Sequence, residues 1–185
     1  MEILARIVLF VLATLFFLRV SWRALHNPGT HGFYRFFVFE GILLLALINQ
    51  PHWFVDPFSA QHILSWCLLL VSICFIFQSL WMLKKRGGHA ERKGMPENHD
   101  FENTVNVVDT GLYRYIRHPM YSSLLFLAWG AFLKHISLVT LSLVVGVSVF
   151  LFVAARVEEN ENIRFFGDSY REYMKRSKLF IPWIV

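Results

Sequence analysis

Four long apolar stretches limit the folds that are open to this 185-residue chain. They cover residues 3–20, 33–48, 63–83 and 137–157. A membrane-spanning helix needs roughly 17–25 mainly apolar residues, and the second stretch reaches that length when Asn49 and Gln50 lie at the membrane interface. A shorter fifth stretch covers residues 119–133. We therefore expect an all-α, polytopic membrane protein, a helical bundle with five transmembrane helices.

The composition of the chain supports this expectation. Hydrophobic residues make up 56% of the chain and charged residues 17%, and the mean hydropathy is +0.47. A soluble domain of this length buries a core with far less apolar content. The first stretch contains Arg6, and no small-x-small cleavage site precedes the polar residues 23–31. We therefore expect it to be a retained helix rather than a secretory signal peptide.

The lysines and arginines are distributed unevenly along the chain. If five helices alternate in direction, all 18 of these residues except Arg6 and Lys134 fall on one side. The positive-inside rule then predicts an amino terminus outside and a carboxyl terminus in the cytoplasm. The net charge of +5 favours contact with anionic membrane lipids. No basic helix or aromatic-basic repeat indicates a nucleic-acid partner.

The carboxyl-terminal third has clear boundaries. The tight turn at residues 134–137 predicts that the last two long helices form an antiparallel hairpin. Gly167 ends the second of them, and Asp168 is a good N-cap for a short helix over residues 169–176. Its aromatic face favours an interfacial helix. The apolar ending, residues 179–185, is expected to pack against the bundle or the lipid.

The longest polar segment covers residues 87–110 and is rich in glycine and charge. A loop of this length in a compact protein is uncommon and often functional. We expect it to cap a site on the cytoplasmic face, and a plain connector is the alternative.

The segment Arg117-His-Pro-Met-Tyr121 precedes an apolar helix. Pro119 suits the first turn of that helix, so its amino end, with free N–H groups, is expected to face the cytoplasm. Such an end binds carboxylate or phosphate, and Arg117, His118 and Tyr121 add donors. An aromatic-basic belt at the membrane interface is the alternative reading.

Two acids end the next apolar helix. Carboxylates at the carboxyl end of a helix oppose its dipole, so Glu158 and Glu159 need compensation from Arg156, Arg164 or a bound cation. A hairpin brings them to the same membrane face as His118. A ligand with an amine, ribose hydroxyls or a sulfonium suits the acids, while its carboxylate suits the helix start. S-adenosylmethionine has all of these groups.

The same residues carry a family resemblance. Gly-x-Tyr-x-x-x-Arg-His-Pro-x-Tyr at 111–121 resembles the signature of the isoprenylcysteine carboxyl methyltransferase family. The later matches to that family's ending are Glu158-Glu159, Phe166-Gly167, Tyr170, Tyr173 and Pro182. The resemblance implies a single membrane domain over residues 1–185, with a cofactor-binding half at about 84–185. It implies an enzyme that takes S-adenosylmethionine from the cytoplasm and a lipophilic small-molecule or lipidated acceptor from the bilayer.

The resemblance also assigns residues to roles. The cofactor pocket it implies contains Gly111, Tyr113, Arg117, His118, Pro119, Tyr121, Glu158 and Glu159. We expect Arg156 and Glu159 to be catalytic, with Arg156 holding an anionic acceptor; the alternative is that Arg156 simply pairs with Glu159. The family's arginine four residues before the first glutamate is Ala154 here, which leaves a prenylcysteine acceptor open.

Other polar residues lie outside these motifs. Glu40 lies inside the second apolar stretch, where an unpaired acid is costly, and is expected near Arg156 or Arg117. His31, His89 and His99 have no spacing that favours a metal or haem, so we expect no metal site. The competing functions are a membrane reductase or isomerase of sterol-like or carotenoid-like lipids that uses nicotinamide or haem, and a non-enzymatic membrane protein.

Overall fold

The structure is a computed structural model that describes residues 3–88 and 103–182, and every regular element within them is helical. The all-α prediction is therefore confirmed for this part of the chain. The long helices are α1 (Ile3–Val20), α3 (His31–Asn49), α4 (Ala60–Arg86), α5 (Pro119–Phe132) and α6 (Leu138–Phe166). The short ones are α2 (Trp22–Leu25), η1 (Gln50–His52), η3 (Gly111–Arg114) and α7 (Asp168–Arg176).

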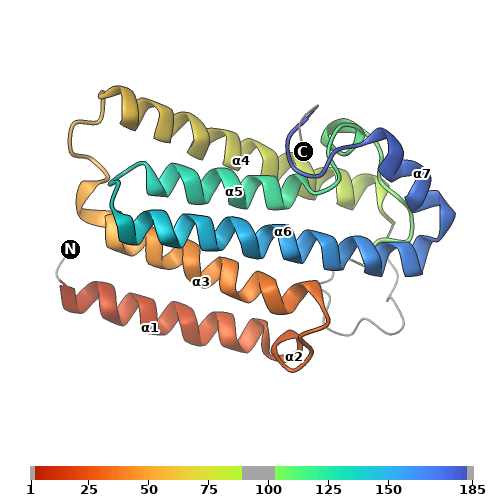
Figure 1. Cartoon of the computed structure of the whole chain (residues 1–185), viewed down its shortest axis with the longest axis horizontal. Coiled ribbons are helices and arrows are strands. Elements are labelled where there is room, and N and C mark those ends of the chain that lie inside the picture. Colours follow the sequence, from red (N-terminus) through yellow and green to blue (C-terminus); the bar gives the residue numbers. More distant parts are fainter. Residues whose placement is uncertain (1–2, 89–102, 183–185) are drawn as a thin grey trace.

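The long helices lie side by side and alternate in direction (Figure 1). The start of α3, the end of α4, the start of α5 and the end of α6 all lie at the end of the bundle that carries α7. We call this the α7 end. The amino terminus and the α3–α4 and α5–α6 connections lie at the opposite end, the turn end (Figure 1). Residues far apart in the sequence therefore meet at the α7 end.

Four helical segments are long and apolar enough to cross a membrane: Ile3–Val20, His31–His52, Ala60–Arg86 and Leu138–Phe166. The fifth predicted span differs. Helix α5 has 14 residues, which is about 21 Å at 1.5 Å per residue, against a hydrocarbon core of about 30 Å. Four of the five predicted spans thus have the required length, and the count of five stays a prediction.

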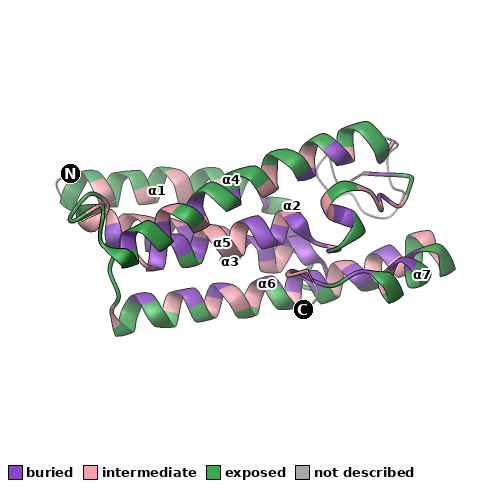
Figure 2. Ribbon diagram, turned by 90° about the horizontal axis from the view of Figure 1, so that it is seen from above, coloured by how far each residue is buried: buried purple, intermediate pink, exposed green. Residues whose placement is uncertain are grey.

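Helix α5 lies in the interior of the bundle. Eight of its residues are buried, whereas none of those in α1 is (Figure 2). Its small residues allow close approach: Ser65 Oγ on α4 donates to the Gly130 carbonyl at 2.7 Å. Helix α5 packs chiefly against α4, and α6 packs chiefly against α3. The connection at 133–137 is short, and α5 and α6 also contact each other, so the predicted hairpin is neither excluded nor confirmed and stays a prediction.

Helix α1 joins the bundle through α3. Thr14 Oγ1 donates to Glu40 Oε2 at 2.9 Å, and Arg6 Nη1 donates to the Leu47 carbonyl at 3.4 Å. Glu40 therefore faces α1. The expectation that it lies near Arg156 or Arg117 is wrong, because its position on α3 turns it toward the first helix.

Two glycines provide a matched test of the packing. A Cβ at Gly41 of α3 would overlap Val147 Cγ2, whereas a Cβ at Gly146 of α6 would meet nothing within 4 Å. We predict that Gly41→Ala lowers the free energy of unfolding by about 1–3 kcal/mol, as overpacking does. Gly146→Ala is expected to be neutral or slightly stabilising, because alanine favours helix.

Thermal unfolding of the detergent-solubilised variants measures this difference. Equal melting temperatures for Gly41→Ala and Gly146→Ala would contradict the close α3–α6 contact.

Candidate active site

The segment that leads into α5 is shaped by a glycine and a tyrosine. Gly111 has a φ of +62°, and a Cβ there would lie 2.9 Å from Met82 Cε on α4. Tyr113 packs with Met82 and Val108, and its carbonyl accepts a hydrogen bond from the Tyr173 hydroxyl at 2.6 Å. The η3 turn is thereby held between the end of α4 and α7.

The carboxyl-terminal tail pairs with the same segment. Ile116 and Lys178 form an isolated parallel bridge, in which Arg117 N–H donates to the Lys178 carbonyl at 2.7 Å. Ser122 Oγ donates to the Phe180 carbonyl at 2.7 Å. Leu179 and Phe180 are buried in the main apolar core. The prediction that the apolar ending packs against the bundle is confirmed for these two residues.

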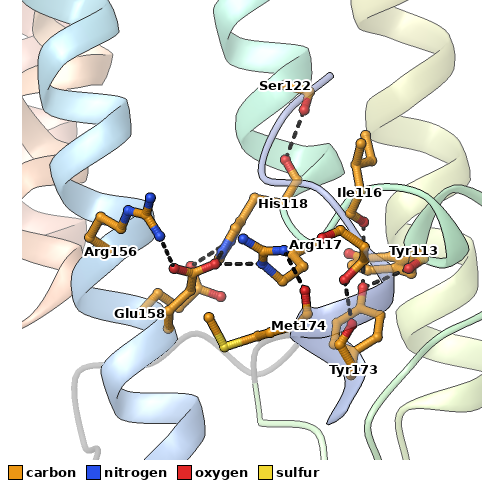
Figure 3. A network of polar contacts seen from close by, with 11 residues as sticks. Tyr113, Ile116, Arg117, His118, Ser122, Arg156, Glu158, Tyr173 and Met174 are labelled. Atoms are coloured by element: carbon orange, nitrogen blue, oxygen red, sulfur yellow. Dashed lines mark hydrogen bonds and ion pairs between the residues drawn. The ribbon is translucent and has the colours of Figure 1, made fainter. Parts of the chain in front are cut away.

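A buried carboxylate joins α6 to this assembly (Figure 3). Glu159 is 2% exposed, and its Oε1 lies 2.5 Å from Arg117 Nε while its Oε2 lies 2.9 Å from Arg156 Nη1. Arg117 Nη1 also donates to the backbone oxygens of Met174 and Ser177. The two polar clusters of the sequence therefore touch directly.

A cavity of about 270 Å³ lies beside this ion cluster. Helices α3, α4, α5, α6 and α7 and the residues before η3 all contribute to its wall. The polar wall residues are His31, Arg35, Thr104, Asn106, Tyr113, Arg117, His118, Tyr121, Glu158, Glu161, Asn162, Tyr170 and Tyr173. The apolar ones are Phe39, Ile76, Leu83, Val107, Val108, Met120, Leu124 and Phe166.

Three tyrosines of the wall are neutral hydrogen-bonding groups. Burial raises the pKa of Tyr113 and Tyr170 well above the usual value, and the Glu158 carboxylate raises both further. Burial also raises the pKa of Tyr173. All three phenols consequently keep their protons near neutral pH.

The predicted site residues fall into two groups. Those in the cavity wall are Tyr113, Arg117, His118, Tyr121 and Glu158. Gly111 shapes the turn, and Pro119 is the buried first residue of α5. Arg156 and Glu159 are outside the wall that the described residues form. The side chain of Arg156 is 52% exposed and pairs with Glu159, which is the alternative role considered for it.

The predicted interfacial helix exists as α7, but its aromatic face turns inward. Tyr170 and Tyr173 are buried and line the cavity instead of facing a membrane interface. Of the predicted capping loop, the residues Thr104, Asn106, Val107 and Val108 form part of the wall. Residues 89–102, which include His89 and His99, lie outside the described part of the chain.

Helix α3 supplies wall residues that the sequence reading missed. His31 Nδ1 lies 2.6 Å from Glu161 Oε2, and the His31 backbone N–H donates to Glu161 Oε1 at 3.1 Å. Arg35 follows one turn later and is 7% exposed. The available signal was the i, i+4 spacing of two polar side chains at the start of an apolar helix. Among the described residues, no group of three or more histidines, cysteines or acids can hold a metal ion.

The fold and the cavity define a class of protein, a helical membrane protein with a polar site at one end of the bundle. The sequence profile described as "Phospholipid methyltransferase" matches residues 60–169, and the chain belongs to this family. The match covers α4 to the start of α7 and includes both polar clusters. The resemblance to a family of membrane methyltransferases is thereby confirmed.

Three curated relatives carry the name methanethiol S-methyltransferase. The protein from Bradyrhizobium diazoefficiens is 33% identical over 72 residues, which is 39% of this chain and 25% of the relative. The Pseudomonas deceptionensis protein is 25% identical over 119 residues, which is 64% of this chain and 42% of the relative. The Mycobacterium tuberculosis protein is 28% identical over 72 residues, which is 39% of this chain and 29% of the relative. The chain thus matches less than half the length of these relatives, and no solved structure matches it.

The contribution of the Arg117–Glu159 contact to the stability of the protein can be measured directly. Arg117→Gln leaves a buried carboxylate with one arginine partner, and we predict a loss of about 3–5 kcal/mol in the free energy of unfolding. Arg114→Gln removes an exposed arginine from the same segment and is expected to change it by about 0.5 kcal/mol or less.

Thermal unfolding in detergent compares the two variants. If Arg117→Gln melts at the same temperature as Arg114→Gln, the ion cluster does not hold the α7 end together.

Proposed function

We propose that this protein is a membrane methyltransferase that uses S-adenosylmethionine to methylate a small lipophilic thiol. The observation that carries the proposal is one cavity wall that holds both His118, at the amino end of α5, and Glu158, near the end of α6. Membership of the phospholipid methyltransferase family supports the reaction class. The printed names of the relatives support the acceptor class.

The residues of the cavity fit the groups of S-adenosylmethionine. His118 is buried, with Nδ1 3.7 Å from Glu158 Oε2 and Nε2 3.8 Å from Glu159 Oε1, and no described side chain caps the amino end of α5. These donors suit the carboxylate of the amino-acid part. Glu158, with 29% of its side chain exposed, suits the amine or the ribose hydroxyls. Tyr170 and Phe166, whose rings are stacked with centroids 6.2 Å apart, offer aromatic surface to the adenine.

When bound, S-adenosylmethionine would supply an activated methyl group on a positively charged sulfur. The residues of the chain would orient the two reactants and exclude water from the site. The phenols of Tyr113 and Tyr170 stay neutral, so they donate hydrogen bonds without adding charge beside the sulfonium. Arg117 and Glu159 fix the start of α5 against α6. A dry site that aligns two reactants supplies most of the acceleration that such a displacement needs.

The residues of the site favour a small thiol over a prenylcysteine. Prenylcysteine-methylating members of the family resemble one another in having an arginine four residues before the first glutamate. The residue at that position here is Ala154, which is fully buried. A thiol ionises more easily than an alcohol or an amide, so it needs no strong base in the site.

The membrane arrangement completes the proposal. The α7 end carries most of the lysines and arginines, so the positive-inside rule puts it in the cytoplasm. The cofactor would then enter from the cytoplasm, and the acceptor from the bilayer. On this arrangement α5 is a fifth, shorter membrane helix enclosed by its neighbours, and residues 1–185 form one domain.

Binding of S-adenosylhomocysteine, the product of the donor, tests the donor site. Calorimetry on detergent-purified protein is expected to detect binding, and Glu158→Gln is expected to weaken it roughly tenfold to a hundredfold, since a charge-assisted hydrogen bond contributes about 1.5–3 kcal/mol. Glu172→Gln is the matched control, because Glu172 is an exposed residue of α7.

Wild-type protein that is folded but binds no S-adenosylhomocysteine would refute the proposed function. If Glu158→Gln and Glu172→Gln weaken the binding of S-adenosylhomocysteine equally, Glu158 is not part of the donor site.

A further inference from the structure

We infer that Phe39 of α3, Ile76 of α4 and Leu124 of α5 form the floor of the cavity and limit the length of the hydrocarbon group that the acceptor thiol carries. The inference rests on the proposed function and specifies the acceptor side of the same cavity. It adds three specificity-determining residues that lie outside the sequence motifs.

The first support is the depth at which these residues lie. The cavity wall follows α3, α4 and α5 from the α7 end toward the middle of the bundle, and Phe39, Ile76 and Leu124 are its furthest described residues on these helices. Phe39 is eight residues after His31, which is about 12 Å along α3. Ile76 is seven residues before Leu83, which is about 10 Å along α4. The three side chains therefore lie at the inner end of the cavity.

The second support is the packed core that follows directly below the floor. About one turn further along each helix lie Ile42 of α3, Ser72 of α4 and Ala128 of α5. All three are buried, and none belongs to the cavity wall that the described residues form. Protein interiors are close-packed, so a bound chain can extend further only when a floor residue becomes smaller. The floor is thus a limit on length.

The third support is the chemistry of the floor. Its three side chains are hydrocarbon, and the polar wall residues of α3 and α5 all lie nearer the α7 end of those helices. A polar group buried without a hydrogen-bond partner costs free energy, so this part of the cavity disfavours the ribose hydroxyls and the amine of the donor. The hydrocarbon group of a thiol makes no such demand, and its burial is favourable.

The floor residues are held in place by contacts outside the cavity. The ring of Phe39 lies 5.5 Å from that of Phe17 on α1, measured between centroids. Leu124 packs against the main apolar core. Ile76 follows Phe75, whose ring meets Phe126 of α5 edge-on at 5.3 Å. A chain that reaches the floor therefore meets side chains that their neighbours restrain.

The experiment changes the size of one floor residue in both directions. Ile76→Ala removes three carbons from the floor, and Ile76→Phe adds bulk to it. Ile73→Ala is the matched control, because Ile73 is on the same helix, is 51% exposed and lies outside the wall that the described residues form. The first readout is kcat/KM for methylation of ethanethiol, butanethiol, hexanethiol and octanethiol by protein in lipid nanodiscs.

For wild type, we expect kcat/KM to rise by about threefold to fourfold for each added CH₂ that the cavity buries, and to fall once the chain reaches the floor. Ile76→Ala should move this fall to a longer thiol and raise the ratio of the long-chain to the short-chain value roughly tenfold. Ile76→Phe should lower the same ratio by a similar factor. Ile73→Ala should keep the wild-type profile.

The second readout needs no cofactor. Calorimetry measures binding of the same thiols to protein in nanodiscs, with empty nanodiscs as the blank, and the affinities should follow the same order of chain lengths in each variant. The same profile in Ile76→Ala and Ile73→Ala, or an equal loss for every thiol in Ile76→Ala, would overturn the inference.

Binding of S-adenosylhomocysteine separates this inference from the proposed function. Ile76→Ala should bind it as wild type does, and a large loss there would place the donor at the floor and overturn the inference. Wild type that binds no S-adenosylhomocysteine would refute the proposed function. If thiol binding to that protein still shifts with the size of residue 76, the apolar floor stands as a binding site.

Discussion

The Glu159 carboxylate is the contact on which the α7 end depends. An acid near the carboxyl end of a helix opposes the helix dipole, and burial adds a desolvation cost of several kcal/mol. Arg117 and Arg156 offset these costs, and Arg117 also binds the carbonyls after α7. One buried charge therefore sets α5, α6 and the tail relative to one another. The cavity beside it has its shape because these three segments cannot shift independently.

The cavity has two chemically different regions because of how the helices end. At the α7 end, the start of α5, the end of α6 and the tyrosines of α7 supply donors, carboxylates and aromatic rings. Further along, α3, α4 and α5 supply only apolar side chains such as Phe39, Ile76 and Leu124. Under the proposed function, a polar nucleoside donor would occupy the first region and an apolar acceptor the second.

The sequence predicted what depends on local pattern and short connections. The apolar stretches predicted the long helices, and the short turn at residues 134–137 predicted that His118 and Glu158 lie at one end. Contacts between distant segments were not predictable: His31 and Glu161 are 130 residues apart. Hydropathy also cannot distinguish burial by lipid from burial by protein, so it left open how the short stretch that forms α5 crosses the membrane. Glu40 was misplaced for the related reason that spacing within α3 does not reveal which neighbour each face meets.

Photochemical cross-linking of methyl-labelled S-adenosylmethionine, followed by mass spectrometry of the labelled peptides, tests the central claim most directly. The account predicts label on peptides that contain residues 103–121 or 158–173, and loss of that label when excess S-adenosylhomocysteine is present. Label confined to α1 or to the turn end, or label that excess S-adenosylhomocysteine does not reduce, would contradict a donor site between the start of α5 and the end of α6.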